Sequence, residues 1–282
     1  METTLLQYVW LIPLGVFVGT VGTLIGSGGG FILVPILLLL FPALSPQSVT
    51  GISLAVVFFN ALSGSFAYAG MKRIDYKSGL IFAGAALPGS VAGAWMTQFV
   101  PRFLFDLVFG SLLIVVGVLL ALQGKSGTGR NAVDKVPKGK PGVSLFLRTI
   151  IDWEAVQYVF SYNPIIGVLI SVLIGFVSSL LGIGGGIFHV PLLATALNFP
   201  VHIATATSHF VLAITSLTGS FVHLLDGELI RSFGVIAGLS FGVIGGAQWG
   251  ARLSQRFHGV WIIRFLAGSL VLVGVRLLLG AL

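Results

Sequence analysis

Two runs of three glycines are the residues best placed to form a ligand site. Each run, at residues 28–30 and 184–186, interrupts a long apolar stretch. Glycine adopts positive φ without strain, so each run can end a helix and free backbone N–H groups. A helix that starts just after the run directs those groups and its positive dipole end back at the break, which suits an anion. Close helix packing is the alternative role of such glycines.

The second glycine run repeats the first at an offset of 156 residues. Residues 19–38 read GTVGTLIGSGGGFILVPILL, and residues 175–194 read GFVSSLLGIGGGIFHVPLLA. Downstream, ALSGSFAYAG at 61–70 matches SLTGSFVHLL at 216–225 at an offset of 155. An ordered series of matches at a nearly constant offset indicates duplication. Each half is therefore expected to supply one glycine cradle, and the two could clamp one small anion near the membrane midplane.

Neutral polar side chains complete the expected site, because no Lys or Arg lies near either break. Ser53 and Ser208 occupy equivalent positions on the third apolar segment of each half. Hydroxyl and amide groups can donate to anion oxygens, although bonding between helices or to the backbone is their commoner use in membranes. The expected substrate-binding residues are Gly26, Ser27, Gly28, Gly29, Gly30, Ser53, Asn60, Gly182, Gly184, Gly185, Gly186, Thr207 and Ser208.

Histidines distinguish the second half from the first. His189 stands where the first half has Leu33, and His209 stands where it has Leu54. A histidine inside the membrane can carry a proton near neutral pH, so both are candidates for proton coupling. A neutral histidine bonded to a carbonyl group is the alternative. His223, close to the end of its apolar segment, is expected at the membrane interface.

The elements that position these residues must be membrane helices. Of the 282 residues, 56% are hydrophobic and 8% are charged, and the mean hydropathy is +1.06. That is more apolar surface than a soluble core of this size can bury. The chain has no cysteine, which excludes disulfides and thiolate chemistry. It also lacks a carboxylate pair within a span, a metal-spaced histidine cluster and a nucleophile elbow. We therefore expect neither an enzyme nor a cofactor or metal site.

Apolar segments come in two matching sets of five. They cover about 5–25, 30–42, 49–70, 78–99 and 103–122, then 162–182, 186–198, 203–225, 233–251 and 260–280. The second segment of each set is shorter than the ~20 residues that a crossing needs. It is expected either to cross steeply or to form one arm of a re-entrant hairpin, and both give an odd number of crossings per half. A single broken crossing, with four crossings per half, is the alternative.

Charge placement favours the odd number. Six of the 15 basic residues lie in or beside the loop at 123–143, which is typical of a cytoplasmic loop rather than a nucleic-acid patch. If each half crosses the membrane an odd number of times, this loop lies on the same side as the basic residues near 72–77 and 252–256, as the positive-inside rule requires. We therefore expect the N-terminus outside, the central loop in the cytoplasm, and the chain in the cell (inner) membrane.

The fold expected is an all-α polytopic membrane protein. Residues 1–122 and 162–282 form two homologous repeats of inverted topology, with short or broken helices at the glycine motifs. Residues 123–161 form a basic cytoplasmic linker with an interfacial helix near 144–160. The expected partners are a small anionic substrate, the lipid bilayer and, as an option, a second copy in a homodimer. Nucleic acid is not expected.

The duplicated G-x-G-G-G-x-x-x-V-P element and the T-S-H or I-S sequence after it resemble the sulfite exporter TauE/SafE family. The resemblance covers about 8–122 and 162–280. It implies a secondary carrier that exports sulfite, sulfonates or related organic anions. Two departures are Ile52-Ser53, where the family often has Thr-Ser, and the eight spans with which the family is often described. The leading interpretation is alternating access, driven by a gradient; an anion channel, or a membrane scaffold or enzyme that transports nothing, is the alternative.

Overall fold

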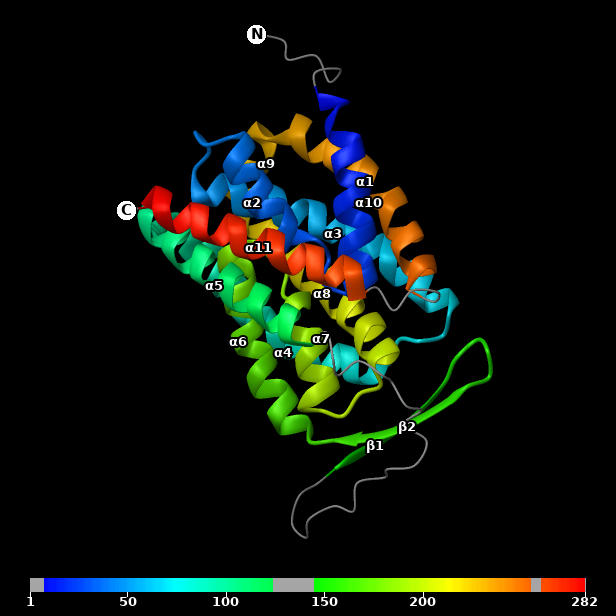
Figure 1. Ribbon diagram of the computed structural model, residues 1–282. Coiled ribbons are helices and arrows are strands. Elements are labelled where there is room, and N and C mark those ends of the chain that lie inside the picture. The colour runs from blue at the N-terminus through cyan, green and yellow to red at the C-terminus, as the bar shows by residue number, and fades with distance from the viewer. Residues whose placement is uncertain (1–7, 124–144, 255–259, 282) are drawn as a thin grey trace.

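The computed structural model describes residues 8–123, 145–254 and 260–281, and these are almost entirely helical (Figure 1). Six of the described helices are long and apolar enough to cross a membrane: α3, α4 with its terminal turn, α5, α6, α8 and α10. The elements are α1 (Leu11–Ile25), α2 (Gly30–Leu40), α3 (Pro46–Gly70), α4 (Tyr76–Met96), the 3₁₀ turn η2 (Thr97–Phe99), α5 (Arg102–Gln123), β1 (Phe146–Ile151), β2 (Gln157–Tyr162), α6 (Pro164–Leu181), α7 (Gly186–Thr195), α8 (Val201–Leu225), α9 (Glu228–Arg231), α10 (Phe233–Leu253) and α11 (Val260–Ala281).

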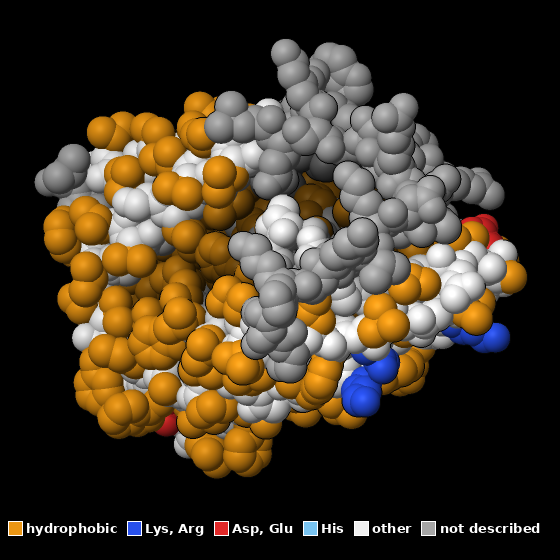
Figure 2. All heavy atoms as spheres, turned by 90° about the horizontal axis from the view of Figure 1, so that it is seen from below, with side chains coloured by type: hydrophobic (Ala, Val, Ile, Leu, Met, Phe, Trp, Pro, Cys, Tyr) orange, Lys and Arg blue, Asp and Glu red, His pale blue; other side chains and the backbone are white. Residues whose placement is uncertain are grey.

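The surface of these helices is apolar. Figure 2 shows hydrophobic side chains over most of the described part of one face, with Lys and Arg confined to a few places. Large side chains such as Phe241 and Leu272 are each 73% exposed, which water would disfavour and lipid would not. The prediction of an all-α polytopic membrane protein is confirmed.

The short segments α2 and α7 return to the end of the molecule from which α1 and α6 set out. At the α9 end, Tyr8 packs against Gly234 at the start of α10, and Ser48 at the start of α3 bonds to Glu228 of α9. The chain that enters α1 and the chain that leaves α2 therefore lie at the same end of the molecule (Figure 1).

The second half does the same at the opposite end, which carries β1 and β2 and is called the hairpin end here. A Cβ atom on Gly167, in the first turn of α6, would lie 3.2 Å from Leu197, just after α7. The ring of Phe199, in the same loop, lies 5.1 Å from that of Tyr162. Each half thus begins with a hairpin of two helices, which is the re-entrant option.

Contacts between the halves are reciprocal. Helix α1 packs along α10 and α6 packs along α4, whereas α3 packs against α8 and α5 against α11. Glycine lets these backbones approach closely: a Cβ on Gly19 would lie 2.7 Å from the Cα of Val243. In the pairs α1–α10 and α6–α4, equivalent helices of the two halves change places, as a two-fold relation between the halves requires. The inverted orientation of the repeats itself stays a prediction.

The prediction of an interfacial helix over 144–160 is wrong, because this segment forms the antiparallel pair β1–β2, with Phe146 opposite Tyr162. The turn between the strands is built by Asp152, whose Oδ1 accepts hydrogen bonds at 3.0 Å from the N–H groups of Glu154 and Val156. The β-branched and aromatic residues on either side suit a strand better than a helix. The rest of the predicted linker, residues 124–144, lies outside the described residues.

Candidate functional site

The two glycine breaks adopt the same backbone conformation. Gly26, Gly28 and Gly29 have φ values of 84°, 75° and 83°, and the equivalent Gly182, Gly184 and Gly185 have 72°, 76° and 80°. Helices α1 and α6 end at the first glycine of each set, and α2 and α7 begin after the last. Only glycine adopts this left-handed conformation readily, so the repeated motif specifies one backbone turn twice.

The two breaks pack directly against each other. A Cβ on Gly30 would lie 2.8 Å from the carbonyl oxygens of both Gly182 and Ile183. A Cβ on Gly186 would lie 2.5 Å from the carbonyl oxygen of Gly26 and from the Cα of Ser27. The first residues of α2 and α7 therefore each touch the break of the other half. We call this contact the glycine clasp.

The clasp leaves helix N-termini without partners. The carbonyl oxygens of Gly29 and Gly185 accept bonds from N–H groups three and four residues later, as in any first helical turn. Among the described residues, no acceptor bonds to the N–H groups of Gly30, Phe31, Gly186 or Ile187. These free donors and the positive ends of both helices meet at the clasp. The arrangement is electrostatically suited to an anion.

Apolar side chains cover the clasp in this structure. Val57 and Leu212, at the middle of α3 and α8, are fully buried and each reach both breaks. A Cβ on Gly184 would lie 2.6 Å from Val57 and 3.1 Å from Leu212. Because these two side chains lie against both breaks, we describe the clasp in this structure as closed. An anion could reach the N–H groups only after α3 and α8 move.

The serines at equivalent positions fasten each half to the other. The hydroxyl of Ser53 on α3 donates to the carbonyl oxygen of Gly182 at 2.6 Å, and that of Ser208 on α8 donates to the carbonyl oxygen of Gly26 at 3.3 Å. In the closed form both hydroxyl protons are thus used on the backbone. Ser27 also bonds to backbone, to the carbonyl of Gly22.

A buried polar cluster adjoins the first break. Thr23 Oγ1 donates to Asn60 Oδ1 at 3.1 Å, and His209 Nε2 lies 3.3 Å from the same hydroxyl oxygen. Because the threonine proton goes to an acceptor, His209 Nε2 carries the hydrogen, and the bare Nδ1 has no partner. The Asn60 Nδ2 group is also unpartnered, and the Tyr68 hydroxyl donates to the carbonyl of Thr23. Asn60 and His209 are thus brought together.

Comparison with known proteins identifies the family. The profile of the sulfite exporter TauE/SafE family matches residues 11–277. The chain belongs to this family. It is 34% identical to the probable membrane transporter protein YunE of Bacillus subtilis, over 97% of this chain and 98% of the relative. It is 29% identical to the probable membrane transporter protein MJ0441 of Methanocaldococcus jannaschii, over 97% of both. No solved structure matches.

The comparisons confirm a multi-pass membrane transporter and the prediction that the chain is not an enzyme.

In this TauE/SafE protein, sequence reasoning missed Thr23, which links Asn60 to His209. A signal was present, because the hydroxyl three residues before the break recurs as Ser179. That serine likewise bonds across helices, to Ser90 at 2.7 Å.

The side chains of two further histidines, His189 and His223, make their contacts away from the clasp. His189 is buried, and its Nε2 lies 3.3 Å from the hydroxyl of Ser171 on α6. His223, expected at the membrane interface, lies in the last turn of α8; it is fully buried in the protein beside Gly51, and neither ring nitrogen has a hydrogen-bond partner. Glu228, which follows α8, accepts a hydrogen bond at 2.6 Å from the hydroxyl of Ser48 at the start of α3.

Thr207 lies at the hairpin end of this transporter rather than at the clasp. Its Oγ1 accepts from the N–H of Asp75 at 3.0 Å. Asp75 receives two bonds from Arg148 of β1, at 2.6 and 3.0 Å, and one from the hydroxyl of Ser78 at 2.6 Å. Burial alone would raise the pKa of Asp75, but the bonds and charge of Arg148 and the Ser78 bonds outweigh it and lower the pKa. The hairpin is therefore attached to α4 and α8.

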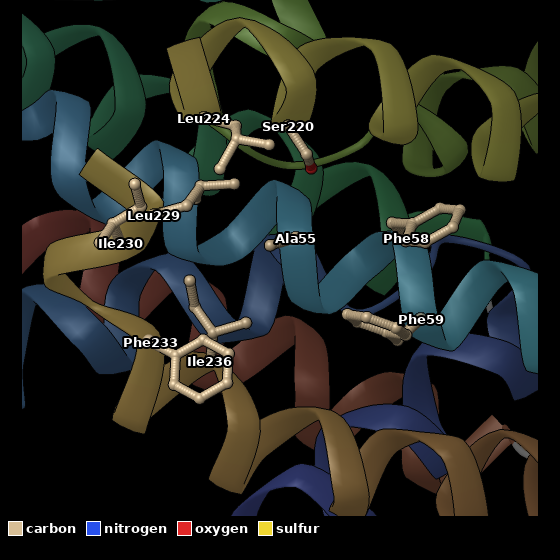
Figure 3. Close-up of a pocket in the computed structure, with 9 residues that line it drawn as sticks. All are labelled: Ala55, Phe58, Phe59, Ser220, Leu224, Leu229, Ile230, Phe233 and Ile236. Carbon is tan, nitrogen blue, oxygen red and sulfur yellow. The ribbon is translucent and has the colours of Figure 1, made fainter. Parts of the chain in front are cut away.

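Two cavities of this transporter lie on the α3–α8 pair. One, of about 260 Å³, is bounded by α3, α8, α9 and α10 (Figure 3). The other, of about 560 Å³, lies towards the hairpin end between α3, α4 and α8. Their linings correspond through the repeat offset of 155: Ala55 with Phe210, Phe58 with Ala213, Phe59 with Ile214, Ser220 with Ser65, Leu224 with Ala69, and Leu229 with Ile74.

Proposed function

We propose that this transporter exports a small sulfur-containing or organic anion, of the sulfite or sulfonate class, by alternating access between two inverted halves. The observation that carries the proposal is the glycine clasp, where two helix N-termini present free N–H donors to each other. An anion held between them would satisfy both ends at once. None of the described Lys and Arg residues lies at the clasp, so the backbone and neutral side chains would hold the charge.

Alternating access fits the way the clasp is fastened. The Ser53 bond holds the second break and the Ser208 bond holds the first. Movement of α3 or α8 away from the clasp would break one of these bonds, uncover its free N–H groups and release a hydroxyl donor for the anion. The same two serines would thus serve as latches in the closed form and as ligands in the open form.

Proton coupling through His209 is part of the proposal. Its Nδ1 is buried and without a partner, so it can take a proton without losing an existing bond. The added charge would lie close to the first break, where it would attract the anion. His189 is the second candidate, since its Nε2 already bonds to Ser171. In this scheme the chain lies in the inner membrane, with the N-terminus outside and the hairpin end on the cytoplasmic side.

The test is counterflow in proteoliposomes with labelled sulfite and with a short sulfonate, measured from pH 5.5 to 8. A carrier gives saturable counterflow, whereas conductance without saturation would identify a channel. His209→Gln keeps a donor for Thr23 but cannot be protonated. We expect it to transport with a flattened pH profile. An unchanged profile in this variant would refute the proton role, and the absence of any anion flux would refute the proposed function.

A further inference from the structure

His223, in the last turn of α8, is a buried titratable residue that the proposed mechanism does not use. Its side chain is 0% exposed, and neither ring nitrogen has a hydrogen-bond partner. Buried polar groups are almost always paired, because an unpaired one lowers stability. The ring of His223 is therefore a candidate for a role in a form of the protein other than the closed one.

The same position in the first half holds a residue whose polar group is paired. Tyr68 is the repeat equivalent of His223 at the offset of 155, and its hydroxyl donates to the carbonyl oxygen of Thr23 at 2.9 Å. Tyr68 lies in a buried cluster with Ala206. His223 lies against Gly51, the equivalent of Ala206, because a Cβ there would be 3.2 Å from the ring. The halves thus share the packing, but only the α9 end has a group that titrates near neutral pH.

Two carboxylates lie close to His223, and α3 bonds to both. Asp226 and Glu228 are the charged groups that act electrostatically on the ring. Glu228 Oε2 accepts from the hydroxyl of Ser48 at 2.6 Å, and Asp226 Oδ2 accepts from the side-chain amide of Gln47 at 3.2 Å. These bonds tie the start of α3 to the end of α8 and to α9. Neutral donors of α3 thus occupy both carboxylates while the histidine near them is unpaired.

Among the described residues, no other charged group competes for His223. Helices α3 and α6 have no charged residue. The other helices packed on α8 carry Lys77, at the start of α4, and His189, on α7, and both lie towards the hairpin end. On α9, Arg231 is 78% exposed and lies 3.5 Å from Glu228. A proton on His223 would therefore be balanced by the two carboxylates.

His223 and His209 lie on the same face of α8, because 14 residues make nearly four helical turns. Both side chains face α3, where His209 lies against Gly64 and His223 lies against Gly51. About 21 Å of helix separates them, so one lies at the end of the molecule and the other beside the clasp. Movement of α3 away from α8 at the α9 end would therefore act on the helix pair that covers the clasp.

We propose that His223 is a proton-binding residue that opens the α9 end of the transporter. A proton gives both ring nitrogens an N–H group, and the imidazolium pairs with Glu228 or Asp226 in place of the neutral donors of α3. Loss of the Ser48 and Gln47 bonds then frees the start of α3 from α8 and α9. The proposal rests on the alternating access proposed for this transporter and names the α9 end as the side where the coupling proton enters.

The experiment uses the absence of cysteine from the chain, so that one introduced thiol reports the opening. Val49 on α3 is fully buried next to Ser48, and its repeat equivalent, Ala204 on α8, is fully buried at the hairpin end. Val49→Cys and Ala204→Cys are each labelled in detergent with a water-soluble maleimide at pH 5.5 and pH 8, without added sulfite or sulfonate. Because maleimide reacts with the thiolate, each rate is divided by the rate in the same variant carrying His223→Gln.

A histidine that reaches water titrates at about pH 6.5. Since only the open form would bind the proton, acidification from pH 8 to pH 5.5 should favour opening about tenfold. We expect the labelling ratio of Val49→Cys to rise about tenfold and that of Ala204→Cys to stay constant. His223→Leu should give the same result as His223→Gln, and both should fold, because the ring has no hydrogen bond to lose.

A second variant tests the exchange of partners. Asp226→Asn combined with Glu228→Gln keeps acceptors for Gln47 and Ser48 but removes both charges. We expect it to abolish the pH response of Val49→Cys, and a response that survives would overturn the exchange.

The outcomes separate this inference from the proposed function. A labelling ratio that does not change with pH, or an equal rise in Ala204→Cys, would overturn the opening by His223 and leave anion transport untouched. A response that depends on His223, in a protein that shows no anion flux in proteoliposomes, would refute the proposed function and support the opening.

Discussion

Adding one methyl group to the glycine clasp tests its geometry directly. Gly186 is the first residue of α7 and does not have a positive φ, so alanine is allowed by its backbone. In Gly186→Ala the new Cβ would lie 2.5 Å from the Gly26 carbonyl oxygen and from the Cα of Ser27. Ordinary contact begins near 3.4 Å, so the breaks must separate by about 0.9 Å.

The expected cost in stability depends on whether the atoms next to the new Cβ can move. The Gly26 carbonyl oxygen and the Ser27 Cα are backbone atoms in a buried turn, so they cannot rotate away as a side chain could. Overpacking of this kind costs about 1–3 kcal/mol. Gly245→Ala in α10 is the control, because a Cβ there meets nothing within 4 Å and should gain up to about 1 kcal/mol of helix stability. The stabilities of the two variants should therefore differ by about 1–4 kcal/mol, with opposite signs of change relative to wild type.

The assay is thermal unfolding in detergent, followed by counterflow in proteoliposomes. We expect the Tm of Gly186→Ala to lie at least about 2 °C below that of Gly245→Ala. Gly30→Ala, whose Cβ would lie 2.8 Å from two carbonyl oxygens, should behave in the same way. Counterflow should be lost in the clasp variants and kept in Gly245→Ala. Equal stability of all three variants would mean that the breaks do not touch.

Three further predictions concern the hydrogen bonds. Arg148→Gln leaves the buried Asp75 without its ion pair, at a cost of about 3–5 kcal/mol, and the hairpin should become sensitive to protease. The pKa of Asp75 is lowered in the folded protein, so its ion pair stabilises the wild type above about pH 4, and this contribution is lost as the pH falls through the lowered pKa. The stability of the variant should therefore fall less than that of the wild type on acidification from pH 5 to 3. Ser53→Ala strands the carbonyl of Gly182 and should lower stability by about 1–3 kcal/mol, more than Ser208→Ala, whose bond is longer; equal Tm values would contradict this. Thr23→Val leaves Asn60 and His209 without their shared partner and should lower stability by about 1–3 kcal/mol; a flux–pH profile like that of wild type would count against the cluster.

Helix positions and the breaks could be predicted because they are encoded locally. An apolar run of 20 or so residues fixes a membrane helix, and three glycines fix a turn with positive φ. The predicted segments and the described helices accordingly agree to within a few residues over most of the chain. The pairing of Ser53 with the other half's break was only partly predictable. Equivalence of Ser53 and Ser208 was visible in the sequence, but their partners depend on how α3 and α8 cross.

The errors lie where neighbours distant in sequence decide the structure. The segment 144–160 combines apolar and charged residues, which suits an interfacial helix as well as a strand. The hairpin is selected by docking: Arg148 pairs with Asp75, and Phe160 packs 4.4 Å from the ring of Phe199. Thr207 was expected at the substrate site as one of the hydroxyl residues of the third apolar segment, and its role in binding stays a prediction, but its hydroxyl lies beside Asp75 rather than at the clasp. On a helix adjacent residues point about 100° apart, so one faces the break and the other faces α4.

In the proposed mechanism, the two halves combine equivalent backbones with different side chains. Two identical halves related by inverted symmetry would give inward-open and outward-open forms of equal energy. The glycine turns and the Ser53 and Ser208 latches are shared by both halves, so they can support both forms. His209 and Leu54 occupy equivalent positions in the two halves. His209 packs against Gly64, and Leu54 packs against Gly219. If the proposed proton coupling holds, a proton on His209 would change the energy of one latch and not the other, which is the differential interaction by which an ion shifts such an equilibrium.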